Sequence, residues 1–234
     1  MGLYTTSGLL AFVKQQARRP SSDAAMPDSQ WYIYLSRGQR EWLMTIATIA
    51  PEANMSAPTL LSSADGNVTY TFGLDSDGLP ILPIGHVELY DGPRGLLLRP
   101  GTYDDPSCDY VIEGNTVRFP GNVSRTYHNG LYARYTNPQP ADIGASQEPT
   151  LQPVNARSLI GYRALILYAQ ESGDRDPSNW IQAETRYWAG NPAIGDYGIL
   201  GMLKSQYRNA GMAAIPAPPI YWWRNTNWGQ GYSP

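Results

Sequence analysis

Cysteine and histidine are scarce in this chain of 234 residues, which contains one Cys and two His. A single thiol, Cys108, excludes an internal disulfide framework, and one Cys with two His cannot complete a zinc site of the Cys/His type. We expect Cys108 to be a small, reduced and partly buried residue. We also expect no metal site and no cofactor.

Charged residues are few as well, since 17 basic and 20 acidic residues make up 16% of the chain, whereas soluble domains usually carry ~25%. There are no basic runs, so nucleic acid is not expected to be the main partner, because phosphate binding needs clustered Lys and Arg. No apolar run reaches the ~18 residues of a transmembrane helix. The N-terminal residues lack the basic segment of a secretory signal. We therefore expect synthesis in a reducing cytoplasm and no membrane partner.

Catalytic signatures are missing too: there is no GxSxG turn, no GxxxxGK loop, no GxGxxG after a strand and no HExxH helix. His86 and His128 are expected on separate strands or strand ends, where positions on a sheet surface explain them. Asp109 and Glu113 would suit glycoside hydrolysis only in a cleft that held both carboxylates at a defined separation. Alternation instead places both on one solvated face of a strand. We predict no enzymatic activity and no catalytic residue.

The acidic residues in the middle of the chain do not build a metal-binding motif. Asp104, Asp105 and Asp109 lie close together, and residues 75–78 resemble only the start of a calcium loop, without its further ligands and terminal Glu. Because Asp side chains bind the nearby backbone in turns, a turn role is the simpler interpretation.

Glycine, proline, tyrosine and tryptophan are plentiful, with 23, 20, 17 and 7 residues against only 3 Phe. Gly and Pro indicate turns and extended segments. Amphipathic rings such as Tyr and Trp suit surfaces that meet other proteins.

The hydrophobic pattern predicts an α+β fold, in which N- and C-terminal helices pack together as a bundle, an inserted antiparallel β-sheet or sandwich projects from them, and the C-terminal arm is extended. The first helix begins at a cap among residues 5–7 and ends before Pro20, and the second runs from Asp28 or Ser29 to Pro51. Residues 155–171 are apolar almost all round, which is typical of a helix at the centre of a bundle. Asp176 followed by Pro177 opens another helix, and a weaker one spans 197–208.

Between the helices, short β-type runs alternate with turn dipeptides such as Asp91-Gly92 and Asn129-Gly130. This spacing is typical of a small antiparallel sheet or sandwich. The candidate strands are residues 68–72, 86–90, 96–99, 109–113, 116–119 and 130–135. The expected organisation is an N-terminal helical hairpin (1–56), a β insertion (57–152), C-terminal helices that pack on the hairpin (153–210) and an extended arm (211–234).

The arm is rich in aromatic residues and proline and contains one charge. Disordered tails are usually poor in aromatics and rich in charge, so the arm is expected either to fold back on its own domain or to dock on a neighbouring subunit or another protein. Trp and Tyr anchor interfaces, and proline lowers the entropy lost on docking. The candidate partner-binding residues are Ile220, Tyr221, Trp222, Trp223, Arg224, Trp228 and Tyr232.

The chain resembles the head-to-tail adaptor proteins (connectors, or head-completion proteins) of tailed bacteriophages over most of residues 3–210. The resemblance rests on the order of its segments more than on any single residue. The segments are TTSGLLAFVKQQAR, DSQWYIYLSRGQREWL, LLSSADGNVTYTFG, LLLRPGTYDDPSCDYVIEGNTVRFP, YARY, RSLIGYRALILYAQESGD and DPSNWIQAETRYW. The β insertion is larger than in the smallest, all-helical adaptors, which leaves its partner open.

The resemblance implies a structural virion protein at the head–tail junction. It implies a homo-oligomer, a dodecameric ring, that connects the portal protein to a tail or nozzle protein and lets DNA pass without sequence-specific binding. The C-terminal segment would dock on the portal. An alternative from another class is a carbohydrate-binding or glycan-active tail protein that uses the aromatic β insertion.

Overall fold

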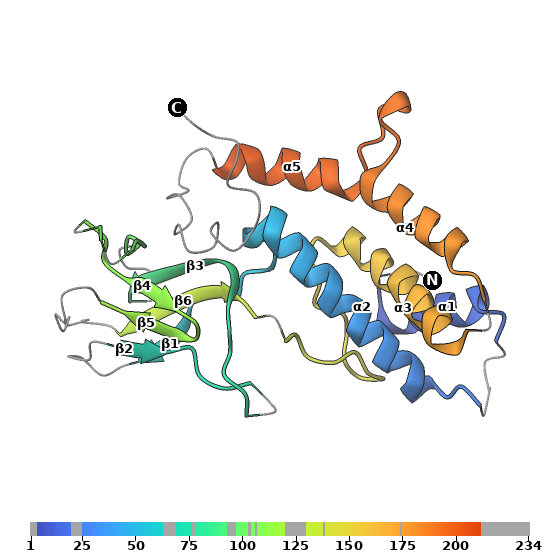
Figure 1. Cartoon of the computed structure of the whole chain (residues 1–234), viewed down its shortest axis with the longest axis horizontal. Coiled ribbons are helices and arrows are strands. Elements are labelled where there is room, and N and C mark those ends of the chain that lie inside the picture. The colour runs from blue at the N-terminus through green and yellow to red at the C-terminus, as the bar shows by residue number, and fades with distance from the viewer. Residues whose placement is uncertain are drawn as a thin grey trace. The chain divides into compact units, whose positions relative to one another are not determined.

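The computed structural model describes residues 4–19, 25–62, 69–75, 78–92, 97–102, 104–105, 107–119, 130–137, 139–173 and 175–211. The described residues form two compact units (Figure 1). The helical unit combines residues from 1–54 and from 139–209, and the β unit comprises residues from 55–138. Helices and antiparallel strands therefore occupy separate parts of the chain, and the α+β class predicted from the sequence is confirmed.

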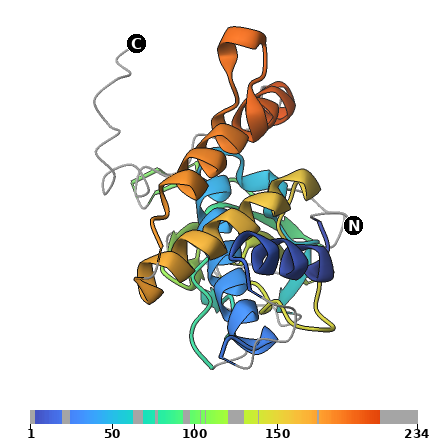
Figure 2. The same cartoon turned by 90° about the vertical axis from the view of Figure 1, so that its right-hand side faces the viewer.

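The helical unit contains five α-helices: α1 (Thr6–Gln16), α2 (Asp28–Ile49), α3 (Arg157–Ser172), α4 (Ser178–Ala189) and α5 (Gly198–Gly211). Short 3-10 turns follow α2 at η1 (Pro51–Asn54), precede α3 at η3 (Val154–Ala156) and join α4 to α5 at η4 (Pro192–Ile194). Helix α3 packs against α1, α2 and α4 (Figures 1 and 2). Ten of its 16 residues are buried, so the central position expected for this apolar helix is confirmed.

Glycine permits the closest helix approaches in this unit. At Gly38 of α2 an added Cβ would lie 3.0 Å from the carbonyl oxygen of Ile160 in α3. At Gly161 of α3 it would lie 2.8 Å from Cδ1 of Phe12 in α1. Both distances are shorter than ordinary carbon contacts, so these two positions let α1 and α2 approach α3 more closely than a larger residue would allow.

An extended segment, residues 139–152, packs along α2 and belongs to the helical unit. Gln39 of α2 is buried and holds this segment on both sides: its Nε2 donates to the Ala141 carbonyl (3.2 Å), and its Oε1 accepts from the Thr150 N–H (2.8 Å). Asn54 and Gln152 bind each other through two hydrogen bonds. The sequence boundary at 152 placed this segment with the β insertion, whereas its described residues group with the helices.

The β unit contains two antiparallel sheets of three strands each. One sheet has the order β1 (Thr59–Ser62), β6 (Leu131–Thr136), β3 (Ile84–Asp91), and the other has the order β2 (Thr69–Thr71), β5 (Thr116–Arg118), β4 (Val111–Glu113). Side chains from both sheets share one core, where the Phe72 and Tyr135 rings lie 5.1 Å apart. This shared core makes the unit a small sandwich.

Two strand predictions differ from the structure. Strand β1 was not foreseen, and the described residues of the candidate strand 96–99 form only an isolated bridge, between Leu97 and Tyr90. At the helix ends, Thr5 caps α1 as expected by accepting from the Gly8 N–H (3.2 Å). Helix α2 instead follows Pro27, without a side-chain cap. None of the helices in the described part of the chain combines the length and apolar character needed to cross a bilayer.

Candidate functional site

The seven partner-binding residues predicted in the arm lie outside the described residues. They are Ile220, Tyr221, Trp222, Trp223, Arg224, Trp228 and Tyr232. The candidate sites that the structure does describe are a polar cluster on the β unit, a buried carboxylate and a cavity in the helical unit, and two apolar projections.

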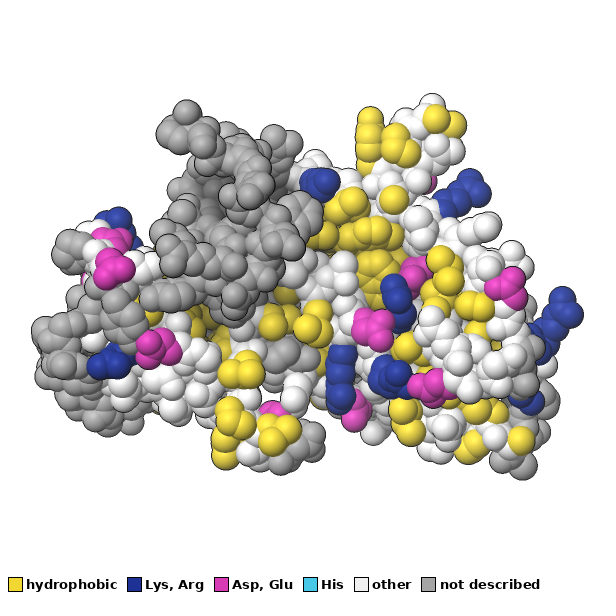
Figure 3. All heavy atoms as spheres, viewed as in Figure 1, with side chains coloured by type: hydrophobic (Ala, Val, Ile, Leu, Met, Phe, Trp, Pro, Cys, Tyr) yellow, Lys and Arg dark blue, Asp and Glu magenta, His cyan; other side chains and the backbone are white. Residues whose placement is uncertain are grey.

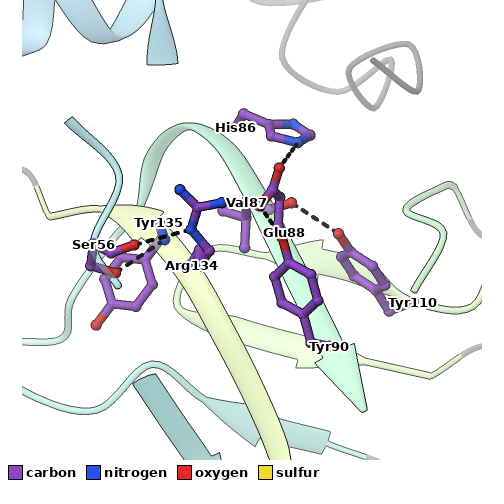
Figure 4. Close-up of polar contacts among 8 residues, drawn as sticks. All are labelled: Ser56, His86, Val87, Glu88, Tyr90, Tyr110, Arg134 and Tyr135. Atoms are coloured by element: carbon purple, nitrogen blue, oxygen red, sulfur yellow. Dashed lines mark hydrogen bonds and ion pairs between the residues drawn. The ribbon is translucent and has the colours of Figure 1, made fainter. Parts of the chain in front are cut away.

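The polar cluster lies on one face of the sheet β1–β6–β3 (Figure 4). Strand β3 alternates: Val87 and Leu89 point into the core, whereas His86, Glu88 and Tyr90 share the opposite face. Because β3 and β6 pair in antiparallel register, Arg134 of β6 lies directly opposite Glu88. The period of two brings a histidine, a carboxylate, a phenol and a guanidinium onto one surface.

Glu88 is the centre of this cluster. Its Oε2 accepts hydrogen bonds from the Tyr90 hydroxyl and from Nη1 of Arg134 (3.1 Å), and its Oε1 lies 3.7 Å from Nε2 of His86. Arg134 also donates through Nε to the Ser56 carbonyl (3.2 Å). The carboxylate is therefore engaged by its own strand and by β6, an arrangement that ties β3 to β6 through charge-assisted hydrogen bonds.

Burial and the neighbouring Glu88 carboxylate raise the pKa values of the tyrosine hydroxyls in this region. Burial, and then the hydrogen bond to Glu88, raises the pKa of Tyr90 above its ordinary value. On the core face, Tyr110 donates to the Val87 carbonyl (2.9 Å), and burial strongly raises the pKa of its hydroxyl. Both phenols therefore stay protonated at neutral pH and act as hydrogen-bond donors.

The helical unit holds a second charged cluster around Glu184 of α4, whose side chain is only 7% exposed. Its Oε1 accepts hydrogen bonds from Nε1 of Trp42 and from Nε of Arg163, each at 2.9 Å. The Arg163 guanidinium also lies over the Trp42 ring, and Trp188 packs on that ring at 4.8 Å. Burial raises the pKa of Glu184, and the Arg163 cation opposes this shift. The cluster joins α2, α3 and α4 at the centre of the bundle.

A cavity of about 480 Å³ opens where α1 ends and α4 begins. Two aromatic rings, Tyr162 and Trp180, contribute to its lining. The donor side chains that line it are Gln15, Gln16, Arg18, Arg175 and Asn179. None of these five side chains makes a hydrogen bond or ion pair with another described residue. Figure 3 shows Lys and Arg side chains at this end of the unit, on the right of the view.

Two projecting segments carry exposed apolar side chains (Figure 3). The hook, residues 191–197 between α4 and α5, is held by hydrogen bonds through Asn191 and Asp196, yet Ile194 and Tyr197 are 72% and 62% exposed. The leucine loop, the described residues 73–75 and 78–82 between β2 and β3, exposes Leu74, Leu79 and Leu82. Exposed apolar projections of this kind are typical of contacts with other proteins.

Of the acidic residues considered from sequence, Asp75 and Asp105 serve turns, whereas Asp109 binds a backbone segment ten residues away. Asp105 accepts from the backbone N–H and hydroxyl of Ser107, and Asp109 accepts from the Arg99 N–H (2.8 Å). Asp75 accepts from the Leu79 N–H (2.8 Å). Among the described residues, no three His, Cys, Asp or Glu side chains are placed together to hold a metal ion.

The remaining candidates are dispersed. Cys108 is buried, and its thiol pKa is raised by burial. His86 lies in the polar cluster, Glu113 is exposed at the end of β4, and His128 lies outside the described residues. Alternation along β3 was the available signal for the polar cluster. The cavity could not be predicted from the sequence, because residues near the end of α1 and residues of α3 and α4 line it together, and these segments lie more than 140 residues apart in the chain.

Comparison with sequence models of known protein families finds no match. A search of curated proteins finds no relative of this chain.

Proposed function

We propose that the chain is a structural virion protein, an oligomeric ring adaptor that connects the portal to the tail of a bacteriophage. The observation that carries the proposal is the topology: helices from both ends of the chain build one unit around α3, and the β unit is inserted between them. This is the order of segments on which the resemblance to phage adaptors rests. The proposed role includes docking of the arm on the portal or on a neighbouring subunit.

Surface chemistry supports an assembly role. The hook and the leucine loop present aliphatic and aromatic side chains to solvent from hydrogen-bonded segments. Such groups gain free energy when a partner covers them, at roughly 25 cal/mol per Å² of apolar area. A subunit whose surface is largely interface also tolerates the low charge of this sequence.

The alternative of a glycan-binding β insertion finds less support. A platform for sugar stacking requires exposed rings, whereas five aromatic side chains of the β unit are buried: Tyr70, Phe72, Tyr110, Phe119 and Tyr135. They pack on one another and on aliphatic residues in the sandwich core. Among the described residues of this unit, the rings therefore serve folding more than ligand contact.

The proposal is tested by mixing the purified chain with the portal protein encoded beside it and imaging the product by electron microscopy. A ring of this chain seated on the portal is expected. A chain that stays monomeric and ignores the portal would contradict the proposal.

The role of the arm is tested with a variant that lacks residues 212–234. Attachment to the portal should be lost while the circular dichroism of the described helices is retained. Two double variants of the full-length arm then test whether its aromatic side chains are needed. Trp222→Ala with Trp223→Ala should abolish attachment to the portal, and Asn225→Ala with Asn227→Ala should not. If the truncated chain unfolds instead, the arm is a strap on its own domain.

A further inference from the structure

We propose that the cavity between α1 and α4 binds the proline-rich segment 215–220 of a second copy of this chain. The inference rests on the proposed function, because it names the surface that receives part of the arm when copies assemble. It concerns residues of the helical unit for which the sequence suggested no role.

The side chains that line the cavity suit a ligand rich in hydrogen-bond acceptors. Arg18 and Arg175 contribute only donors, whereas each of the side-chain amides beside them offers both a donor and an acceptor, and none of these side chains has a partner among the described residues. The one carboxylate in the lining, Asp176, already accepts from the backbone N–H and the hydroxyl of Ser178 (2.9 and 2.6 Å). A ligand that brings carbonyl oxygens and few N–H groups fits this imbalance.

A proline-rich segment is such a ligand. Proline has no N–H, so residues 215–220 (Ile-Pro-Ala-Pro-Pro-Ile) present six carbonyl acceptors but only three backbone donors. Pro216 and Pro219 have the PxxP spacing, which favours the polyproline II conformation, and segments of this kind dock between aromatic rings. Tyr162 and Trp180 supply rings in the cavity. A single anion would satisfy the guanidinium groups but would leave the rings and most of the volume unused.

The length of the chain after α5 favours a second copy over the same chain. Figure 1 shows α4 and α5 running in the same general direction, so the C-terminal end of α5 lies far from the N-terminal end of α4, where the cavity is. With 12 and 14 residues, the two helices are about 18 and 21 Å long. The five residues from Gly211 to Pro216 span at most ~18 Å, too little to return along both helices. A head-to-tail contact between copies generates a ring when its rotation closes, which is the assembly that the proposed function requires.

The test is photo-crosslinking of the full chain with a benzophenone amino acid at Ala217, between the prolines. Equal amounts of chain with natural and with heavy nitrogen are mixed, crosslinked and analysed by mass spectrometry. We expect crosslinks from position 217 to peptides that contain Tyr162, Asn179 or Trp180, with mixed isotopes that identify them as contacts between copies.

Variants decide whether the cavity makes the contact. Arg175→Ala combined with Asn179→Ala removes two lining donors, and Trp180→Ala removes a ring. Each should lower the crosslink yield by about tenfold, the loss typical of an anchor residue. Met44→Ala on α2 is the matched control, because it removes an exposed apolar side chain that lies outside the cavity, the hook and the leucine loop, and it should leave the yield unchanged. Circular dichroism melting confirms that each variant is folded. If Trp180→Ala does not fold, the variant with Arg175→Ala and Asn179→Ala still provides the test.

Crosslinks confined to one chain, crosslinks to another surface, or yields that the cavity variants do not change would overturn the inference. Loss of the crosslink in excess inorganic phosphate would also overturn it, because the cavity would then prefer an anion. Portal attachment is measured separately on Pro216→Ala with Pro219→Ala. If that variant and the unmodified chain both attach while no cavity crosslink forms, the inference fails and the proposed function stands. If crosslinks to the cavity form but no portal attachment is found, the inference stands and the proposed connection to the portal fails.

Discussion

Replacing Arg163 by methionine tests the charged cluster at the centre of the helical unit. The variant keeps the length and much of the apolar contact of the side chain but removes the cation that faces Glu184. The carboxylate would then remain buried, with the indole N–H of Trp42 as its remaining hydrogen-bond donor among the described residues. Removing one partner of a buried ion pair usually costs 3–5 kcal/mol. Because Arg163 is 31% exposed, we expect about 2–3 kcal/mol at pH 7.

The pH dependence follows from the pKa shift. Burial raises the pKa of Glu184 in the folded state above its unfolded value. Such a group stabilises the fold fully below the unfolded pKa and loses that contribution as pH rises through the folded pKa. Arg163→Met should raise the folded pKa further, since it removes a cation that lowers it. At about pH 4 the carboxyl group is mostly protonated, and the penalty should fall to about 1 kcal/mol, the cost of a lost hydrogen bond.

Urea denaturation followed by tryptophan fluorescence, at pH 7 and at pH 4, measures both penalties. Arg40→Met is the matched control, because Arg40 and Asp142 form an ion pair (2.7 Å) with side chains 43% and 67% exposed. Its loss should cost less than about 1 kcal/mol at either pH. An Arg163→Met penalty that does not change with pH, or that equals the Arg40→Met penalty, would refute the reasoning.

Three further predictions concern packing, a phenol and a cap. Gly161→Ala should destabilise the helical unit by about 1–3 kcal/mol through overlap with Phe12, and Phe12→Leu in the same chain should recover part of that loss in a double-mutant cycle. Glu88→Gln should lower the pKa of Tyr90 toward its ordinary value, because it removes the charged acceptor, although burial keeps that pKa raised. Ultraviolet titration of the difference against Tyr90→Phe measures the shift, and an unchanged pKa would contradict the hydrogen bond. Thr5→Ala should cost about 1 kcal/mol by removing the side-chain cap of α1. Thr5→Ser should cost far less in the same denaturation experiment.

Local rules predicted the helices well because each helix carries its own signals. Helix α3 was expected at the centre of the bundle from its apolar residues alone, and the structure places it between α1, α2 and α4. Asp176 was expected to open α4, and its carboxylate accepts from the Ser178 N–H. A β-type run that ends at the turn dipeptide Asp91-Gly92 located β3 to within two residues at its start and one at its end.

Features that depend on distant contacts were not predicted. Strand β1 has four residues and no turn dipeptide at its start, and it is defined only by pairing with β6. Residues 139–152 contain no periodic pattern, and they pack on the helical unit through single polar side chains such as Gln39. The cavity arises where three helices meet. The residue pattern within one segment does not predict its contacts with distant segments, because those contacts depend on where the other segment lies in the fold.

The insertion of the β unit between α2 and α3 sets the order in which the chain folds during synthesis. Between Ile49 and Arg157 lie 107 residues. At about 5–20 residues per second, the ribosome needs roughly 5–20 s to make them. During that interval the apolar side of α2, with Trp31, Leu35 and Ile46, has no α3 to cover it. All the described strands of the β unit have been made by residue 136, so they can pair first, while the apolar side of α2 stays without its α3 partner on the nascent chain.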